Sequence, residues 1–153
     1  MAKNKTLSKE NALAILDKVA LFDDLSRTDK NLLAEFHWCF VTYNPGDFLT
    51  DEGSLDKRFF ILLSGGANVL KGQQEQLLTQ LKPGEIIGEI SFLTNEPRTA
   101  SVIANTSSSA LVIDQDLLDK LPIEVRERLK DQIILRMAQR LNRMNNRFAL
   151  GHL

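Results

Sequence analysis

Residues that commonly build disulfides and metal centres are scarce in this chain of 153 residues. Cys39 is its only cysteine, so an internal disulfide and a zinc site made of cysteines are both excluded. The two histidines, His37 and His152, are too few for a histidine-rich metal centre. No nucleophile paired with a general base is recognisable either. The composition therefore predicts a protein without a metal cofactor that is not an enzyme.

An excess of one charge sign and long apolar runs are absent as well. The chain has 19 Lys and Arg against 20 Asp and Glu, and a net charge of −1 gives no general attraction to nucleic acid or anionic membranes. No apolar run approaches the roughly 20 residues that a membrane-spanning helix needs. The basic residues near the start are not followed by the apolar stretch of a secretory signal. These absences predict a cytoplasmic protein with a single domain, residues 1–153.

The pattern over residues 8–36 is helical, and that over residues 37–114 is typical of short strands. Ser8 is placed to cap a first helix, and Ser26 with Asp29 resembles a capping box at the start of a second. From residue 37 onward, short apolar segments alternate with turns that contain glycine, which indicates a β-sandwich or barrel. We place strands at 37–43, 47–51, 58–63, 67–71, 76–81, 85–87, 100–104 and 109–114.

A helical pattern returns near the C-terminus and predicts one long helix over residues 116–149. Pro122 suits the first turn of a helix, and the following acid, Glu124, suits the positive end of its dipole. An apolar stripe along this helix comprises Leu129, Ile133, Met137, Leu141, Met144 and Phe148. The stripe is broad enough to serve both its own barrel and a partner helix, so intramolecular packing and dimerisation both stay open. The predicted architecture is mainly β with flanking helices.

The segment 84–104 has the composition of a small anion-binding loop. A strand ends near residue 87, Gly88 allows a tight turn, and a short helix begins at Glu89. The first amides of a helix have no partner within it and point at whatever lies beyond its end. Arg98 follows Pro97, which breaks the helix, and a guanidinium can grip phosphate oxygens in a fork geometry. Glu89, which we place near Arg98, can accept a hydrogen bond from a hydroxyl group.

This segment resembles the phosphate-binding cassette of the cyclic nucleotide-binding domain family. Residues 88–91, Gly-Glu-Ile-Ser, and residues 97–100, Pro-Arg-Thr-Ala, match each element of that cassette, which spans residues 88–100 here. The glycine-marked strands are similar to the family's β-roll, and residues 137–141 resemble the dimer helix of its catabolite-activator branch. The resemblance covers about residues 12–148. It implies a double-stranded β-helix, or jelly-roll barrel, with a C-terminal helix that acts as lid or dimer helix.

The resemblance also implies a cyclic nucleotide ligand and a role for each residue of the cassette. Arg98 would bind the cyclic phosphate and Glu89 the ribose 2′-hydroxyl. Other residues of the cassette would complete the binding site around the phosphate and ribose, namely Gly88, Ile90, Ser91, Thr99 and Ala100. The apolar wall and the base contacts would come from Val69, Leu78, Leu81, Ile87, Arg143, Met144 and Asn145. Thr99 suits binding of cyclic GMP but is also compatible with cyclic AMP.

Less specific interpretations stand beside this one. Glu89 and Arg98 could form a structural ion pair that closes a loop, and the domain could be a degenerate member that serves as a protein-interaction scaffold. The arginines of the C-terminal helix are most often a solvated face, so binding of nucleic acid through them is a minority interpretation. Since no effector domain is recognisable in the chain, we expect the output to be an effector protein in trans, a change in self-association, or a domain that lies outside this sequence.

Overall fold

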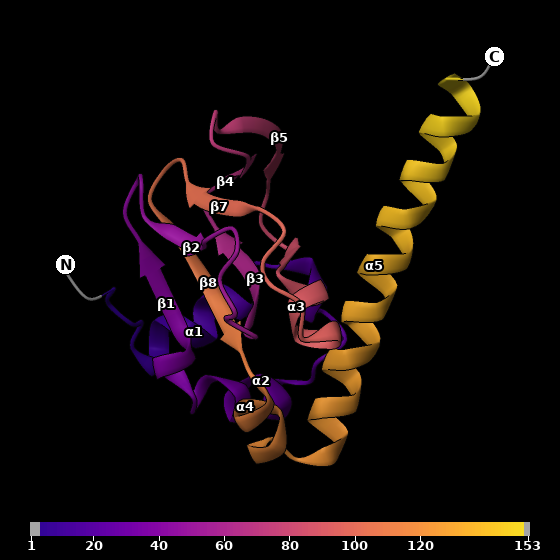
Figure 1. Ribbon diagram of the computed structural model, residues 1–153. Coiled ribbons are helices and arrows are strands. Elements are labelled where there is room, and N and C mark those ends of the chain that lie inside the picture. Colours follow the sequence, from indigo (N-terminus) through magenta and orange to yellow (C-terminus); the bar gives the residue numbers. More distant parts are fainter. Residues whose placement is uncertain (1–3, 152–153) are drawn as a thin grey trace.

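Two four-stranded antiparallel sheets form the body of the molecule, and helices surround it (Figure 1). The computed structural model describes the backbone of residues 4–151 and the side chains of residues 4–146. One sheet has the order β1-β8-β3-β6 and the other β2-β7-β4-β5. The strands are β1 (Phe40–Tyr43), β2 (Phe48–Thr50), β3 (Phe59–Ser64), β4 (Ala67–Lys71), β5 (Gln76–Leu81), β6 (Ile86–Ile87), β7 (Ser101–Ala104) and β8 (Ser108–Ile113). The predicted mainly β architecture with flanking helices is confirmed.

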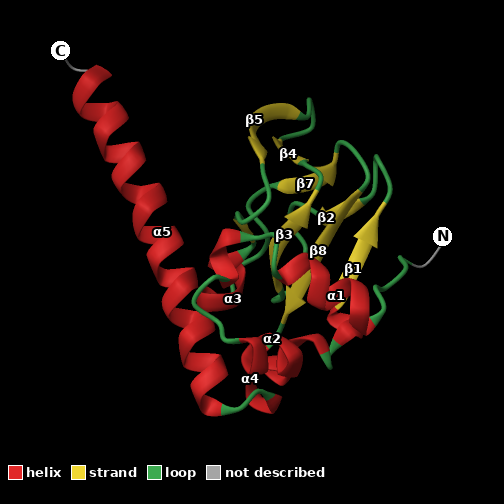
Figure 2. Cartoon of the chain, turned by 180° about the vertical axis from the view of Figure 1, so that it is seen from behind, coloured by secondary structure: helices red, strands yellow, loops and turns green. Residues whose placement is uncertain are grey.

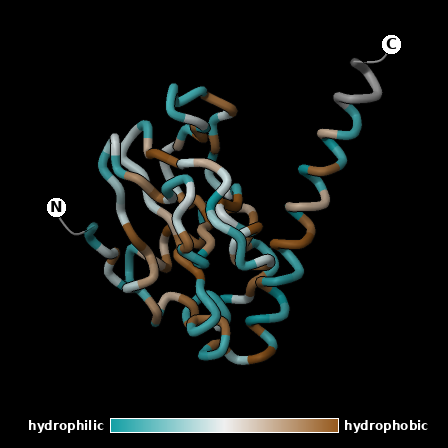
Figure 3. The backbone as a smooth tube through the Cα atoms, in the orientation of Figure 1, coloured by the Kyte–Doolittle hydropathy of each residue, from teal (hydrophilic) through white to brown (hydrophobic). Residues whose placement is uncertain are grey.

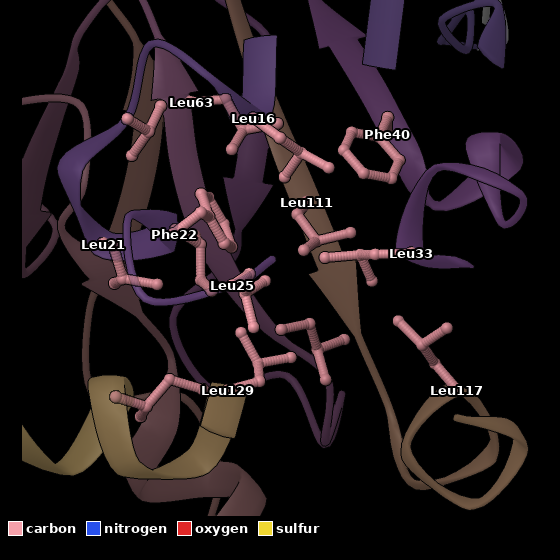
Figure 4. Close-up of a cluster of buried hydrophobic side chains, with 14 of the residues drawn as sticks. Leu16, Leu21, Phe22, Leu25, Leu33, Phe40, Leu63, Leu111, Leu117 and Leu129 are labelled. Atoms are coloured by element: carbon pink, nitrogen blue, oxygen red, sulfur yellow. The ribbon is translucent and has the colours of Figure 1, made fainter. Parts of the chain in front are cut away.

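Strand β3 separates two hydrophobic cores, which explains its unbroken apolar run. Because successive side chains of a strand point to opposite faces, Phe59, Ile61 and Leu63 enter one core, while Phe60 and Leu62 enter the other. The first core lies between the sheet and the helices and includes residues from both ends of the chain (Figure 4). The second lies between the two sheets. A strand covered on both faces needs apolar residues at every position.

The N-terminal helices begin where the capping residues predict. Helix α1 (Lys9–Leu16) has Ser8 as its N-cap, and the Ser8 hydroxyl accepts a hydrogen bond from the Asn11 amide. A 3₁₀ turn, η1 (Ala20–Phe22), leads to α2 (Arg27–Ala34). The predicted capping box is present, because the Asp29 amide donates to the Ser26 hydroxyl at 3.0 Å and the Ser26 amide donates to the Asp29 carboxylate at 3.1 Å.

The strand predicted for residues 37–43 begins three residues later than expected. His37–Cys39 form a 3₁₀ turn, η2, in which the Cys39 amide donates to the Phe36 carbonyl. Trp38 and Cys39 of this turn continue into the apolar residues of β1 and so resemble a strand in the sequence, although Trp38 is exposed and packs edge-on against Phe36. The half-buried His37 ring lies 3.2 Å from the Leu7 carbonyl through its Nδ1.

The single C-terminal helix predicted for residues 116–149 is two helices. Helix α4 (Gln115–Lys120) ends before Leu121, and α5 (Ile123–Gly151) follows Pro122 (Figure 2). A residue before proline is disfavoured in the helical region, and Leu121 adopts an extended conformation with ψ of 143°. Pro122 therefore separates two helices and starts the second, in which the Arg126 amide donates to the Pro122 carbonyl.

Helix α5 packs on the body with its first half and extends away from it with its second (Figure 1). Val125, Leu129 and Ile133 are buried in the core beside the helices. Beyond them, apolar and polar residues alternate along a segment that extends away from the body of the molecule (Figure 3). The predicted stripe member Phe148 lies outside the described side chains. No helix in residues 4–151 combines the length and apolar composition needed to cross a bilayer.

Candidate functional site

A cavity of about 660 Å³ lies between the second sheet, the segment 82–100 and α5. The cassette contributes all seven of its predicted residues to the lining: Gly88, Glu89, Ile90, Ser91, Arg98, Thr99 and Ala100. Five predicted wall residues also line it, namely Val69, Leu81, Ile87, Arg143 and Met144. The fold thus brings together residues that are far apart along the chain, from Thr50 to Met144.

Gly88 is required at its position for two separate reasons. Its φ of +82° lies in the left-handed region that side chains disfavour, and it starts helix α3 (Glu89–Thr94). A Cβ atom added to Gly88 would also lie 2.3 Å from Nη1 of Arg98, which is too close for any real contact. The missing side chain therefore leaves the space in which the guanidinium of Arg98 sits.

Arg98 is held at the base of the cavity and is only 3% exposed. Its Nη1 donates to the Gly88 carbonyl at 2.9 Å, and its Nη2 donates to the Arg58 carbonyl. Its backbone is fixed to the loop after β2, because its amide donates to the Ser54 carbonyl and its carbonyl accepts from the Gly53 amide, both at 2.8 Å. The guanidinium also lies 5.8 Å from the centre of the Phe60 ring, within cation–π range.

The positive charge of Arg98 is only partly compensated by its neighbours, and one of its donor atoms has no hydrogen-bond partner among the described residues. Desolvation lowers the pKa of Arg98, and the opposing charge of Asp56, with Oδ1 at 3.7 Å from Nη2, compensates only partly. Burial alone would raise the pKa of Asp56, but hydrogen bonds from Arg58 and the charges of both arginines hold it below its usual value. The Nε atom of Arg98 is buried and has no hydrogen-bond partner among the described residues. A buried cation of this kind favours an anionic ligand.

Helix α3 presents further donors to the cavity. Its first intrahelical bond runs from the Phe92 amide to the Gly88 carbonyl, so the amides of Glu89, Ile90 and Ser91 precede the hydrogen-bonded turn. Ser91 is buried, whereas Ile90 and Thr99 are exposed. Asn95 ends the helix with a φ of +62°, and the chain then returns through Pro97 to Arg98.

Glu89 lies near Arg98, as expected, and its charge acts to raise the pKa of Arg98, but the two side chains form no ion pair. Its Oε1 accepts from Nη1 of Arg140 on α5 at 3.2 Å, and Nη2 of Arg140 donates to the Ile86 carbonyl at 3.1 Å. The carboxylate beside Arg98 is instead Asp56, which sequence reasoning did not select. The structural ion pair considered above is therefore replaced by two separate pairs, Arg98 with Asp56 and Arg140 with Glu89.

Two predicted wall residues, Leu78 and Asn145, lie outside the cavity lining. Leu78 is 51% exposed and does not line the cavity, although the next three residues of β5, Thr79, Gln80 and Leu81, do. Asn145 is exposed and lies about 100° around the helix from Met144, which does line the cavity. A register error of one residue along α5 turns a side chain by about 100° and so places it on another face of the helix.

Lining residues that sequence reasoning missed include two arginines of α5, Arg136 and Arg140. Together with Arg143 they occur at positions i, i+4 and i+7, a spacing that places them on one helix face. This spacing in the sequence predicts a cationic face on the helix. Five cationic residues line the cavity, namely Lys82, Arg98, Arg136, Arg140 and Arg143. Against them stand two carboxylates, Glu85 and Glu89, so the lining has an excess of three positive charges (5 − 2 = 3) and attracts anions.

Neither a metal-binding cluster nor a reactive thiol is found among the described residues. Within residues 4–151, no cluster of three or more His, Cys, Asp and Glu side chains is arranged to hold a metal ion. Cys39 lies outside the lining, and burial, followed by the charge of Asp114, raises its pKa to about 11. A thiol with such a pKa is almost entirely protonated at neutral pH and is a poor nucleophile.

Comparison with known proteins identifies the family. The sequence profile of the cyclic nucleotide-binding domain matches residues 40–122, more than half of the chain. The chain belongs to the cyclic nucleotide-binding domain family. A cyclic nucleotide-binding domain from Methylobacillus flagellatus has a similar structure, with a TM-score of 0.75 and 23% identity over 98% of this chain and 90% of that chain. The jelly-roll fold expected for the family is therefore confirmed.

Relatives in this family belong to much larger proteins. The human cyclic nucleotide-gated channel beta-1 is 29% identical over 139 residues, which are 87% of this chain and 11% of the channel. The cAMP-dependent protein kinase regulatory subunit of Yarrowia lipolytica is 30% identical over 116 residues, 76% of this chain and 31% of the subunit. The chain thus spans less than a third of the length of either relative.

Proposed function

We propose that this chain is a non-catalytic sensor of cyclic AMP, cyclic GMP or both. The observation that carries the proposal is Arg98, a buried guanidinium that lines an electropositive cavity and keeps its Nε without a partner among the described residues. The names of the relatives, a cyclic nucleotide-gated channel and a cAMP-dependent kinase subunit, support the same ligand class.

In the proposed complex, Arg98 binds the cyclic phosphate and Glu89 binds the ribose 2′-hydroxyl. The amides of Ile90, Ser91 and Ala100, with the Thr99 hydroxyl, complete the phosphate site. Val69, Leu81 and Ile87 form the apolar wall, and Arg143 and Met144 of α5 lie where the base would be covered. Neither phosphate chemistry nor hydrolysis is part of this function, which consists of binding and release.

The output of the sensor is a change in α5, transmitted to an effector protein in trans or to a second copy of the chain. Ile134, Leu135 and Leu141 on the outer half of this helix are large apolar residues exposed by half or more. Exposed apolar residues grouped on one helix favour an interaction surface. The same surface also supports the second candidate function, a protein-interaction module that has kept the fold but binds no nucleotide.

Calorimetric titration with cyclic AMP and cyclic GMP tests the proposal. The wild-type chain should bind at least one of them saturably, and Arg98→Ala should lose about 2 kcal/mol or more of binding free energy through the missing charged hydrogen bonds. Because Arg98 is buried, Arg98→Lys is a second variant that keeps the charge but not the fork, and circular dichroism checks folding. Arg27→Gln, an exposed arginine far from the cavity lining, is the matched control. Equal affinity of wild type and both Arg98 variants contradicts the assignment, and absence of binding by folded wild type favours the scaffold function.

A further inference from the structure

The charge of the cavity is opposite in sign to that of the rest of the molecule. Its lining carries an excess of three positive charges, whereas the whole chain has a formal net charge of −1. The residues outside the lining therefore carry four net negative charges (−1 − 3 = −4). On average, an approaching anion is thus repelled by the remainder of the molecule and attracted by the cavity.

Part of this charge lies on side chains that have no structural partner. Of the five cations in the lining, three form no ion pair among the described residues, namely Lys82, Arg136 and Arg143. The other two, Arg98 and Arg140, each have a carboxylate beside them. Arg136 is half-buried and Arg143 is exposed, so both remain in contact with solvent. Two uncompensated charges of α5 therefore face the space that an entering ligand has to cross.

The stability of the helix does not explain these arginines. Positions 136, 140 and 143 are spaced i, i+4 and i+7, and like charges at such spacings destabilise a helix. Cations interact favourably with the helix dipole only near the last turn, and the last turn of α5, within the described backbone, contains no basic residue. Arg140 at least has an acidic partner, Glu89, whereas Arg136 and Arg143 have none among the described residues. A role toward the cavity that they line accounts for both.

We propose that Arg136 and Arg143 steer the anionic nucleotide into the cavity and so raise its association rate. The proposal rests on the proposed function, since it assigns how the ligand of the same site is captured. Capture and retention then belong to two kinds of arginine. The solvent-accessible charges of α5 act over the screening length of the solution, whereas the buried guanidinium of Arg98 acts through hydrogen bonds at contact distance. Arg143 also lies where the base would be covered, so Arg136 is the residue at which capture is tested alone.

Stopped-flow mixing measures the association and dissociation rate constants separately. The probes are cyclic AMP and cyclic GMP that carry an uncharged fluorophore on the base. At an ionic strength of about 0.01 M, where the screening length is about 30 Å, Arg136→Gln should lower the association rate constant about threefold and leave the dissociation rate constant unchanged. At about 1 M, where the screening length is about 3 Å, the difference from wild type should disappear. Arg143→Gln should show the same salt-dependent loss of association rate.

Three further variants separate charge from shape and local charge from general charge. Arg136→Lys keeps the charge but not the planar fork, so it should associate at the wild-type rate. Lys130→Gln removes one positive charge from an exposed position of the same helix outside the cavity lining, so it should also associate nearly as fast as wild type. Arg98→Lys should have the opposite signature, a faster dissociation at a nearly unchanged association rate, because the fork that holds the phosphate is lost.

The outcomes separate steering from the function on which it rests. A loss of association rate in Arg136→Gln at low ionic strength that Arg136→Lys restores supports steering. If wild type binds nucleotide but Arg136→Gln associates equally fast, or no more slowly than Lys130→Gln, steering is overturned while the sensor function stands. A change confined to the dissociation rate constant also overturns it, since Arg136 is then an ordinary ligand contact. If wild type binds neither nucleotide in the calorimetric titration, the sensor function is overturned and steering with it.

Discussion

The two halves of α5 have the same helical backbone but opposite surroundings. Leu129, in the inner half, is completely buried, whereas Ile134, only five residues later, is 63% exposed. Arg128 of the inner half reaches a buried carboxylate on α2, and Arg140 of the outer half reaches a cavity-lining carboxylate on α3. The inner half therefore belongs to the core of the domain, whereas the outer half contacts the domain mainly at the cavity.

The largest effect on the free energy of unfolding is expected from a cavity in the inner half of α5. Leu129→Ala should destabilise the domain by about 3 kcal/mol, because it removes buried methyl groups from the core formed by the helices and β3. Urea unfolding measures the free energy of unfolding. Leu135→Ala, an equal truncation in the outer half, is the matched control and should cost far less. Similar losses in the two variants would show that the outer half also belongs to the folded core.

A smaller effect is expected at the ion pair between Arg128 and Asp29. Burial alone would raise the pKa of Asp29, but hydrogen bonds from Ser26 and Arg128 outweigh it and lower the pKa below its usual value. A lowered folded-state pKa adds stability above the unfolded-state pKa of about 4, and this is lost as the pH falls through the folded-state value. Arg128→Gln should cost about 1 kcal/mol, since Arg128 is half exposed.

Urea unfolding at several pH values checks the electrostatic origin of that loss. Asp29→Asn should lose less stability than wild type when the pH is lowered below about 4, because its side chain no longer takes up a proton. Lys130→Gln keeps both partners of the pair and should follow the wild-type pH dependence. Parallel curves for wild type and Asp29→Asn would count against this carboxylate as a source of acid sensitivity.

The smallest effect on stability is expected in the outer half. Leu141→Gln should change the free energy of unfolding by no more than about 0.5 kcal/mol, because the side chain is already exposed. The same variant should weaken self-association or effector binding if the outer half of α5 is the output surface. Light scattering of wild type and variant, with and without nucleotide, measures the association. A marked loss of stability would contradict the division of the helix.

The sequence predicted the strands, the helix starts and the cassette because each depends on local chemistry. Ser26 and Asp29 specify a helix start within four residues, and Gly88 specifies a backbone conformation by itself. What the sequence could not predict depends on distant context. The position of Leu78 and Asn145 outside the cavity lining follows from the packed structure, and the ion-pair partner of Glu89 lies 51 residues further along the chain. Pro122 carried the signal for a helix break, but the apolar spacing on both sides of it resembled one continuous helix.

Gly88 also limits how this domain can diversify. A side chain there would meet both an unfavourable φ and the guanidinium of Arg98, so no compensating change at one neighbour would relieve both problems. Ligand preference cannot readily be redesigned at the start of the cassette. The cavity-lining arginines of α5 carry no such backbone constraint, and a library aimed at new ligand selectivity would vary those positions and leave residue 88 unchanged.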